Sequence, residues 1–220
     1  MILTGLNHLA FITCSMEKTI RFYRDLLEMD LIFGIGHPGF RHYFFKCGEG
    51  AVAFFEYSGA QPMKYDKFHG SPTSEPIGFD HVSFTVASRK ELFGLRDKLV
   101  AANVEVSEAI DHGTIWSIYF FDPVNNLPLE ASWNCVEITQ SPEIVDSDPL
   151  QVAEEGSTPQ SGNWPEVSVH TKPSDMVAKP GNGFDMRADF LRRGVAKLKT
   201  GVDDPESGQE NLVVSRKPQN

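Results

Sequence analysis

The feature that most constrains the fold is a pattern that the chain contains twice. Asn7-His8 falls on Asp80-His81, 73 residues further on, and Phe11 falls on Phe84. In each copy the spacing of apolar residues predicts a strand, an amphipathic helix and three more strands. A repeat constrains the whole chain at once, because one such unit cannot bury its apolar face alone. The sequence therefore predicts an α+β fold of two β-α-β-β-β modules, whose sheets form a half-open, barrel-like arrangement around a shared cavity.

The two copies predict the same order of elements. Ser15 is the candidate N-cap of the helix in module 1 (about 4–58), and Ser88 takes that place in module 2 (about 78–134). Expected strands of module 1 lie at 6–12, 31–35, 41–46 and 51–57, with a helix at 16–27. Those of module 2 lie at 79–86, 104–106, 115–121 and 127–133, with a helix at 89–102. The Pro- and Gly-containing stretch 59–77 is predicted to link them within one domain, 1–135.

Residues 136–220 have a different character. The stretch is rich in Pro, Ser, Asp and Glu and has no sustained apolar period, so we expect a largely irregular C-terminal extension. One segment, 184–198 (FDMRADFLRRGVAKL), can form a short basic amphipathic helix. The extension is therefore predicted to contribute little to the core.

Charge and cysteine content limit the partners and the compartment. A net charge of −10 argues against a nucleic acid or an anionic membrane as the partner, since both require a basic face. No apolar run approaches the roughly 20 residues that span a bilayer. The three cysteines are an odd number without paired spacing, and the N-terminus does not resemble a signal peptide. We expect a cytoplasmic protein with reduced thiols.

Four ionisable residues occupy matching places in otherwise apolar strands. His8 and His81 lie in the first strand of each module, and Glu56 and Glu130 lie in the last. Strand alternation predicts that each module directs one imidazole and one carboxylate to the face away from its helix. An isolated buried carboxylate is unstable, so it must be paired, protonated or bound to a metal. A divalent cation bound by His and Glu would satisfy all four groups.

A hairpin near the end of module 2 adds two further candidates. Asp122-Pro123 is typical of a turn, and a hairpin centred between Val124 and Asn125 pairs Tyr119 with Glu130. Directly opposed residues share a face with Cβ atoms about 5 Å apart. His112 stands seven residues before Tyr119, so their side chains converge only if His112 precedes the strand or a bulge intervenes.

These modules resemble the vicinal oxygen chelate superfamily. The resemblance rests on Asn7-His8, Phe55-Glu56, Asp80-His81 and Leu129-Glu130, and it covers about residues 4–134. Members of the superfamily include glyoxalase I, type I extradiol ring-cleaving dioxygenases, fosfomycin-resistance proteins and bleomycin-binding proteins. The resemblance implies a divalent metal in the shared cavity and, as in many relatives, a possible homodimer.

The order of residues on the last hairpin is similar to that of the extradiol dioxygenases: His112, Ile118-Tyr119, Asp122-Pro123, Glu130. That similarity implies Fe(II), or Mn(II), held by His8, His81 and Glu130, with open positions for a catechol-like aromatic and dioxygen. It also implies that His69 is the acid–base group and that His112 and Tyr119 position the substrate and oxygen. The function so implied is that of an oxidoreductase in aromatic compound catabolism.

Glu56 leaves two alternatives open. Glyoxalase I has a fourth carboxylate ligand there, which implies an isomerase or lyase that acts on a carbonyl substrate. Its Ni(II) or Zn(II) would be held by His8, Glu56, His81 and Glu130. A turn centred on Glu49 would instead pair Glu56 with His42, making it a partner of that imidazole. A further alternative is a non-catalytic small-molecule-binding protein of the resistance type.

Overall fold

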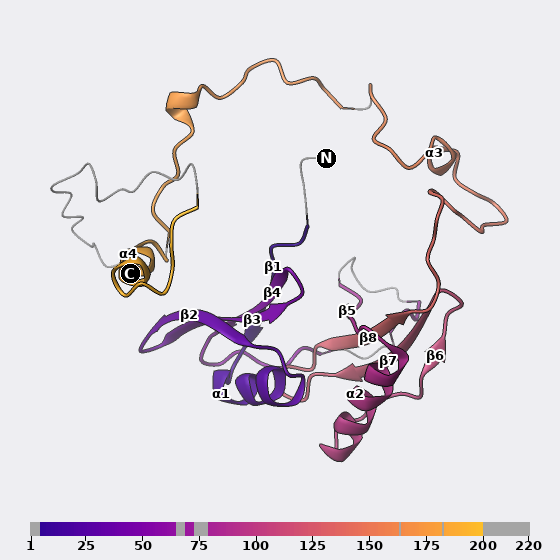
Figure 1. Ribbon diagram of the computed structural model, residues 1–220, viewed down its shortest axis with the longest axis horizontal. Helices are drawn as coiled ribbons and strands as arrows, with labels where there is room; N and C mark the ends of the chain where they lie inside the picture. The colour runs from indigo at the N-terminus through magenta and orange to yellow at the C-terminus, as the bar shows by residue number, and fades with distance from the viewer. Residues whose placement is uncertain (1–4, 65–68, 73–78, 163, 182, 200–220) are drawn as a thin grey trace. The chain divides into compact units, whose positions relative to one another are not determined.

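A computed structural model describes residues 5–64, 69–72, 79–162, 164–181 and 183–199 of the chain (Figure 1). The chain forms two units, 1–166 and 167–220, and each is described by itself. The first unit contains both predicted modules. Each module is a four-stranded mixed sheet with helical turns against one face, and the two sheets do not close into a barrel. The predicted α+β class and the repeat are thus confirmed.

Module 1 has the predicted order of elements. These are β1 (His8–Thr13), α1 (Met16–Ile20), the π-helical η1 (Arg21–Leu26), β2 (Leu31–His37), β3 (Phe40–Cys47) and β4 (Gly50–Glu56). Across the sheet the strands are ordered β1-β4-β3-β2, with β1 parallel to β4 and the other pairs antiparallel. A two-residue turn joins β3 to β4, because Cys47 pairs with Gly50. Gly48 in that turn has a φ of 54°, which glycine adopts without strain.

Module 2 repeats this plan. Its elements are β5 (Val82–Thr85), α2 (Arg89–Ala101), β6 (Ile110–Asp111), β7 (Ile115–Phe121) and β8 (Pro128–Asn134), and its strand order is β5-β8-β7-β6. The predicted cap is confirmed, since Ser88 Oγ accepts a hydrogen bond from the Glu91 N–H. The strand predicted at 104–106 is wrong. Only an isolated bridge joins Val106 to Phe120, and β6 forms the sheet edge instead.

Strand alternation divides each sheet into a face that packs on the helices and an open face. In module 1 the buried Tyr23 ring lies 5.7 Å from Phe45 and 4.7 Å from Phe54. In module 2 the buried side chains are Leu92 and Leu99 of α2 with Ile118, Phe120, Leu129 and Ala131 of the sheet. The apolar residues on one side of each strand are thus used for the core. The other side of each sheet remains available for polar residues.

A buried polar contact joins the two modules. The Tyr23 hydroxyl donates to Asp122 Oδ2 at 3.1 Å, and Asp122 is fully buried. Asp122 also accepts hydrogen bonds from the Val124 N–H and from the backbone and side-chain amides of Asn125. Burial, reinforced by Asp122, holds the pKa of Tyr23 well above its ordinary value, and burial raises the pKa of Asp122. The β7–β8 turn predicted from Asp122-Pro123 therefore also fixes module 2 to the helical segment of module 1.

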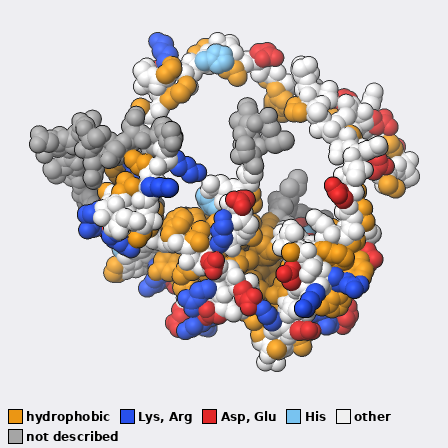
Figure 2. Space-filling model, viewed as in Figure 1, with side chains coloured by type: hydrophobic (Ala, Val, Ile, Leu, Met, Phe, Trp, Pro, Cys, Tyr) orange, Lys and Arg blue, Asp and Glu red, His pale blue; other side chains and the backbone are white. Residues whose placement is uncertain are grey.

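Charged side chains of both signs are interspersed over α1 and α2 (Figure 2). Lys98 of α2 pairs with Glu28 at 2.7 Å, and Arg21 and Arg24 both bond to Asp25. These exposed pairs each contribute little to stability. On the face that Figure 2 shows, the described parts of α1 and α2 have no continuous basic patch.

The C-terminal stretch forms little regular structure among its described residues. After the short α3 (Gln151–Glu154) come a 3₁₀ turn, η2 (Pro173–Asp175), and α4 (Phe184–Arg192). The helix predicted at 184–198 is confirmed in its first nine residues and ends earlier. Gly194 has a φ of 70°, and its N–H donates to the Leu191 carbonyl, which closes the helix. In the part of the chain that is described, no helix is long and apolar enough to cross a membrane.

Candidate metal centre

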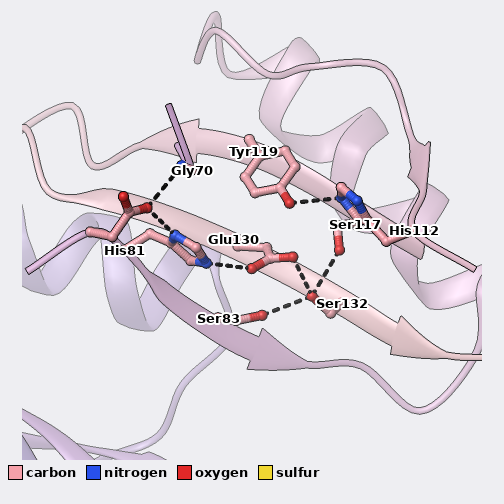
Figure 3. Close-up of polar contacts among 9 residues, drawn as sticks. Gly70, His81, Ser83, His112, Ser117, Tyr119, Glu130 and Ser132 are labelled. Carbon is pink, nitrogen blue, oxygen red and sulfur yellow. Dashed lines mark hydrogen bonds and ion pairs between the residues drawn. The ribbon is translucent and has the colours of Figure 1, made fainter. Parts of the chain in front are cut away.

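Two of the predicted ligands meet on the open face of module 2 (Figure 3). His81 lies just before β5, and Glu130 on β8 pairs in register with Ser83. The distance from His81 Nε2 to Glu130 Oε2 is 2.9 Å. The other ring nitrogen, Nδ1, lies 2.5 Å from Asp80 Oδ1, and that carboxylate also accepts the Gly70 N–H at 3.0 Å. The imidazole is thus held between two carboxylates.

This arrangement requires a positive charge. An ionised carboxylate only accepts hydrogen bonds, so Asp80 places a proton on Nδ1 of His81. A neutral ring then presents the lone pair of Nε2 to Glu130 Oε2, and these two electron-rich atoms repel each other at 2.9 Å. Either a second proton on the ring or a cation bound to both atoms removes the repulsion. The donor set therefore fits a divalent metal, with the second carboxylate orienting the imidazole.

Hydroxyl groups surround Glu130, which is only 3% exposed. Its Oε1 accepts a hydrogen bond from Ser132 Oγ at 2.8 Å. Burial by itself raises the pKa of Glu130, but the hydroxyls of Ser117, Ser132 and Ser83, together with His81, lower that pKa below its ordinary value. The carboxylate is therefore held in its ionised form, which is the form that binds a metal.

Tyr119 and His112 extend the site along β7. Tyr119 stands directly opposite Glu130, so the predicted hairpin register is confirmed. The Tyr119 hydroxyl lies 2.9 Å from His112 Nε2. His112 lies in the turn between β6 and β7, where its N–H donates to the Ile115 carbonyl. It therefore precedes the strand, which is one of the two arrangements that allow its side chain to converge with that of Tyr119. Burial, and then Glu130, raise the pKa of Tyr119, which keeps its hydroxyl protonated.

His69 packs against the same group. Its side chain is 7% exposed, and its ring centroid lies 4.9 Å from that of Tyr119 and 5.6 Å from that of His81. The centroid of the Phe121 ring lies 5.1 Å from that of the His69 ring. Five of the residues singled out in the sequence thus lie together: His81, His112, Tyr119 and Glu130 of module 2, and His69 of the linker.

His8 lies apart from this group. It is on the exposed face of β1, where Nδ1 contacts Asn7 Oδ1 at 2.7 Å and the ring meets Phe44 edge-on at 5.6 Å. Among the described residues, no set of three or more His, Cys, Asp or Glu side chains could hold a metal ion. The prediction that one chain brings His8, His81 and Glu130 to one ion is therefore not met. Within a single chain the site has two of its three expected ligands.

The prediction that Glu56 lies on the face away from the helix, opposite His42, is wrong. The two-residue turn pairs Glu56 with Arg41, not with His42. Its Oε1 accepts the Met16 N–H at 2.7 Å at the start of α1, and its Oε2 bonds to Arg41. Burial raises the pKa of Glu56, but the Met16 N–H and Arg41 together bring it below its ordinary value. Glu56 therefore belongs to the helix side of the sheet.

A difference of one residue in spacing explains this result. Glu130 follows His81 by 49 residues, whereas Glu56 follows His8 by 48, and alternate strand residues point to opposite faces. In module 2, Ser83 stands opposite Glu130. The residue that corresponds to Ser83 in module 1 is Ala10, and Ala10 stands opposite Ala53. Module 1 thus has an alanine at the place where module 2 has its carboxylate.

Comparison with known proteins agrees with this architecture. Residues 5–128 match the model of the Glyoxalase/Bleomycin resistance protein/Dioxygenase superfamily. The chain belongs to this superfamily. A search of curated proteins found no match. The matched residues cover module 1 and module 2 as far as the start of β8, and the rest of β8 and the C-terminal extension lie beyond them.

One solved structure of the superfamily shares the fold. A glyoxylase/bleomycin resistance protein/dioxygenase domain from Frankia sp. EAN1pec is 22% identical, with a TM-score of 0.51 over 60% of this chain and 98% of that one. Lactoylglutathione lyase from Agrobacterium tumefaciens is 20% identical, with a TM-score of 0.45 over 60% and 96%. The fosfomycin resistance protein FosX from Listeria monocytogenes, in complex with Mn(II) and sulfate, is 20% identical, with a TM-score of 0.45 over 61% and 96%.

Sequence reasoning about this superfamily site missed the residues that orient the ligands. Asp80 was assigned no role beyond its place in the repeat, although it holds His81. Ser83, Ser117 and Ser132 were likewise assigned none. The available signal was strand parity, because these serines share the face of Glu130 on three neighbouring strands.

Proposed function

We propose that this protein is a metal-dependent enzyme of the superfamily, and that it cleaves catechol-like aromatic rings with dioxygen in the extradiol manner. One observation carries the proposal: the Tyr119–His112 hydrogen bond lies beside the His81–Glu130 pair, with His69 packed against both Tyr119 and His81. Ring cleavage requires proton donors and acceptors next to a metal that holds two substrate oxygens. This group supplies them on one face of one sheet.

His81 and Glu130 would hold the metal, and His8 would be the third ligand. Two His and one carboxylate form the triad typical of Fe(II) oxygenases, so Fe(II) is the preferred ion and Mn(II) the next. Such an ion, when bound, supplies open positions at which a catecholate and dioxygen can react. Asp80 keeps Nε2 of His81 directed toward the site, and Ser132 does the same for Glu130.

The remaining residues move and hold protons. His69 would accept the proton of a substrate hydroxyl and return a proton to the departing oxygen atom of dioxygen when the O–O bond breaks. Tyr119 carries its proton near neutral pH, as an ordinary tyrosine does, and burial raises its pKa further, so it would donate a hydrogen bond to an oxygen of the bound substrate or of dioxygen. His112 would set the direction of the Tyr119 hydroxyl through their 2.9 Å contact.

The surroundings of Glu56 favour three ligands over four. A glyoxalase-type site needs a carboxylate from module 1, but Glu56 bonds to Arg41 and to the start of α1. Ala53 occupies the place that corresponds to Glu130. These observations support the dioxygenase over the isomerase with Ni(II) or Zn(II).

We also propose that two copies of the chain share each site. His8 is exposed on the open face of its sheet and does not group with His81 and Glu130 in its own chain. A homodimer in which His8 of one copy joins the pair of the other would complete the three-ligand set.

The three cysteines are free thiols, which supports a reducing, cytoplasmic location.

Reconstitution tests the proposed reaction. The purified full chain would be loaded anaerobically with Fe(II) or Mn(II), then mixed with a panel of catechols while oxygen uptake and product colour are followed. We expect turnover with at least one catechol, loss of turnover in Glu130→Gln, and retention of turnover in Glu56→Gln. No turnover, together with activity of a nickel or zinc form on a hemithioacetal, would establish the isomerase instead. Metal-independent binding of an aromatic compound without turnover would indicate a binding protein.

A further inference from the structure

Three serine hydroxyls form a chain across the open face of module 2 (Figure 3). Ser117 on β7 pairs with Ser132 on β8, and Ser83 on β5 pairs with Glu130, two residues before Ser132 on the same face. Ser83 Oγ lies 2.7 Å from Ser132 Oγ, and Ser117 Oγ lies 3.1 Å from it. Ser132 Oγ in turn lies 2.8 Å from Glu130 Oε1. The central hydroxyl thus has three partners.

The direction of these hydrogen bonds follows from counting protons. A hydroxyl has one proton to donate and two lone pairs that accept. Glu130 as a carboxylate can only accept, so the Ser132 proton points at Oε1. Ser83 and Ser117 must then donate to the Ser132 oxygen. All three hydroxyl dipoles are therefore aligned toward the carboxylate, and each strengthens the next.

We infer that Ser132 is the positioning residue for Glu130, and that Ser83 and Ser117 act on the carboxylate through it. Oε1 is committed to the serine chain, so Oε2 is the oxygen directed at His81 Nε2. A carboxylate held in this way meets a cation with one fixed oxygen and loses no rotational freedom when it binds. The inference rests on the proposed role of Glu130 as a metal ligand.

The geometry predicts an order of effects that a merely structural role would not produce. Removing Ser132 breaks the 2.8 Å hydrogen bond to Oε1 and also leaves the two outer serines without their common acceptor. Removing Ser83 or Ser117 leaves the Ser132 bond in place. The double loss of both outer serines should therefore weaken metal binding less than the single loss of Ser132.

Titration with Mn(II) tests this order, with free ion followed by its electron paramagnetic resonance signal. We expect Ser132→Ala to raise the dissociation constant by about 10- to 100-fold, and Ser83→Ala or Ser117→Ala by less than about twofold each. Ser132→Thr keeps the hydroxyl and should recover most of the affinity. Thr13→Val is the matched control, because it removes a buried hydroxyl pair with Thr19 in module 1 and should leave the constant unchanged. Urea unfolding of each variant verifies folding.

Two results would overturn the inference while leaving the proposed function intact. One is wild-type affinity in Ser132→Ala. The other is a loss in the outer double variant as large as the loss in Ser132→Ala. Absence of Mn(II) binding by the wild-type chain would instead overturn the proposed function, and the inference with it. Selective loss in Ser132→Ala that Ser132→Thr restores would establish the positioning role.

Discussion

At the scale of single residues, hydrogen bonds limit the orientations that His81 and Glu130 can adopt. Each side chain uses one atom to bond to the protein and presents the other to the site. His81 is fixed by Asp80, and Glu130 is fixed by Ser132. A metal ligand held this way needs little reorganisation on binding, which raises the affinity of the site.

Replacing Asp80 by Asn should weaken metal binding. The amide can present either its oxygen or its NH₂ group to Nδ1 of His81, so the ring proton is no longer fixed on that nitrogen. We expect about a tenfold rise in the Mn(II) dissociation constant, measured by calorimetry. Asp97→Asn, at an exposed position of α2, is the control and should bind like wild type. Equal affinities of the two variants would contradict the orienting role of Asp80.

Replacing Tyr119 by Phe should impair catalysis without impairing metal binding. The ring and its packing on His69 remain, while the hydroxyl next to His112 is lost. We expect kcat on a catechol to fall by about 100-fold, with Mn(II) affinity within about twofold of wild type. A parallel fall in metal affinity would show that Tyr119 acts on the ligands and not on the substrate.

At the scale of elements, the β7–β8 turn has two tasks. It aligns Tyr119 with Glu130, and through Asp122 it contacts the helical segment of module 1. The Asp122 carboxylate is fully buried and accepts four hydrogen bonds, so its burial is favourable only while these donors remain in place. The turn therefore couples the geometry of the site to the contact between the modules.

Removing Asp122 should destabilise the fold more than removing its partner hydroxyl. Asp122→Ala leaves several buried donors unsatisfied, and we expect the free energy of unfolding to fall by about 2–3 kcal/mol. Tyr23→Phe removes one donor and should cost about 1 kcal/mol. Urea unfolding of both single variants and the double variant measures their coupling. Strictly additive losses would contradict a direct contact.

The raised pKa of Asp122 predicts how its contribution changes with pH. Because the folded carboxyl binds a proton more readily than the unfolded one, its contribution to stability is full below the unfolded pKa and is lost as pH rises through the folded pKa. We expect the difference in unfolding free energy between wild type and Asp122→Asn to decrease from about pH 4 toward neutral pH. A difference that grows over this range would show that the hydrogen bonds outweigh burial.

At the scale of the whole molecule, each chain presents two incomplete surfaces. The open face of module 1 has His8 beside Phe44, and that of module 2 has His81 and Glu130 with the acid–base residues. If the three proposed ligands bind one ion, activity would depend on assembly, because neither surface holds all three.

Mixing inactive variants tests whether the site is shared between copies. His8→Ala and Glu130→Gln should each be inactive as pure proteins. If sites form between copies, a mixed dimer contains one site free of both substitutions, and co-refolding equal amounts should restore about a quarter of wild-type activity. Sedimentation velocity should show a dimer in every sample. No recovery in samples that contain mixed dimers would place all three ligands within one chain.

Sequence alone determined the repeat, the α+β modules and the pairing of Tyr119 with Glu130. These follow from local rules, since alternation and turn residues act over a few positions. Only the tertiary structure decided the partner of Glu56, because the two-residue turn sets the register of β3 on β4 and places Arg41, not His42, opposite it. It also showed that Ser132 and Asp80 hydrogen-bond to Glu130 and His81 and that His8 lies apart. Such contacts join separate strands and loops, and their distances depend on packing that no single segment specifies.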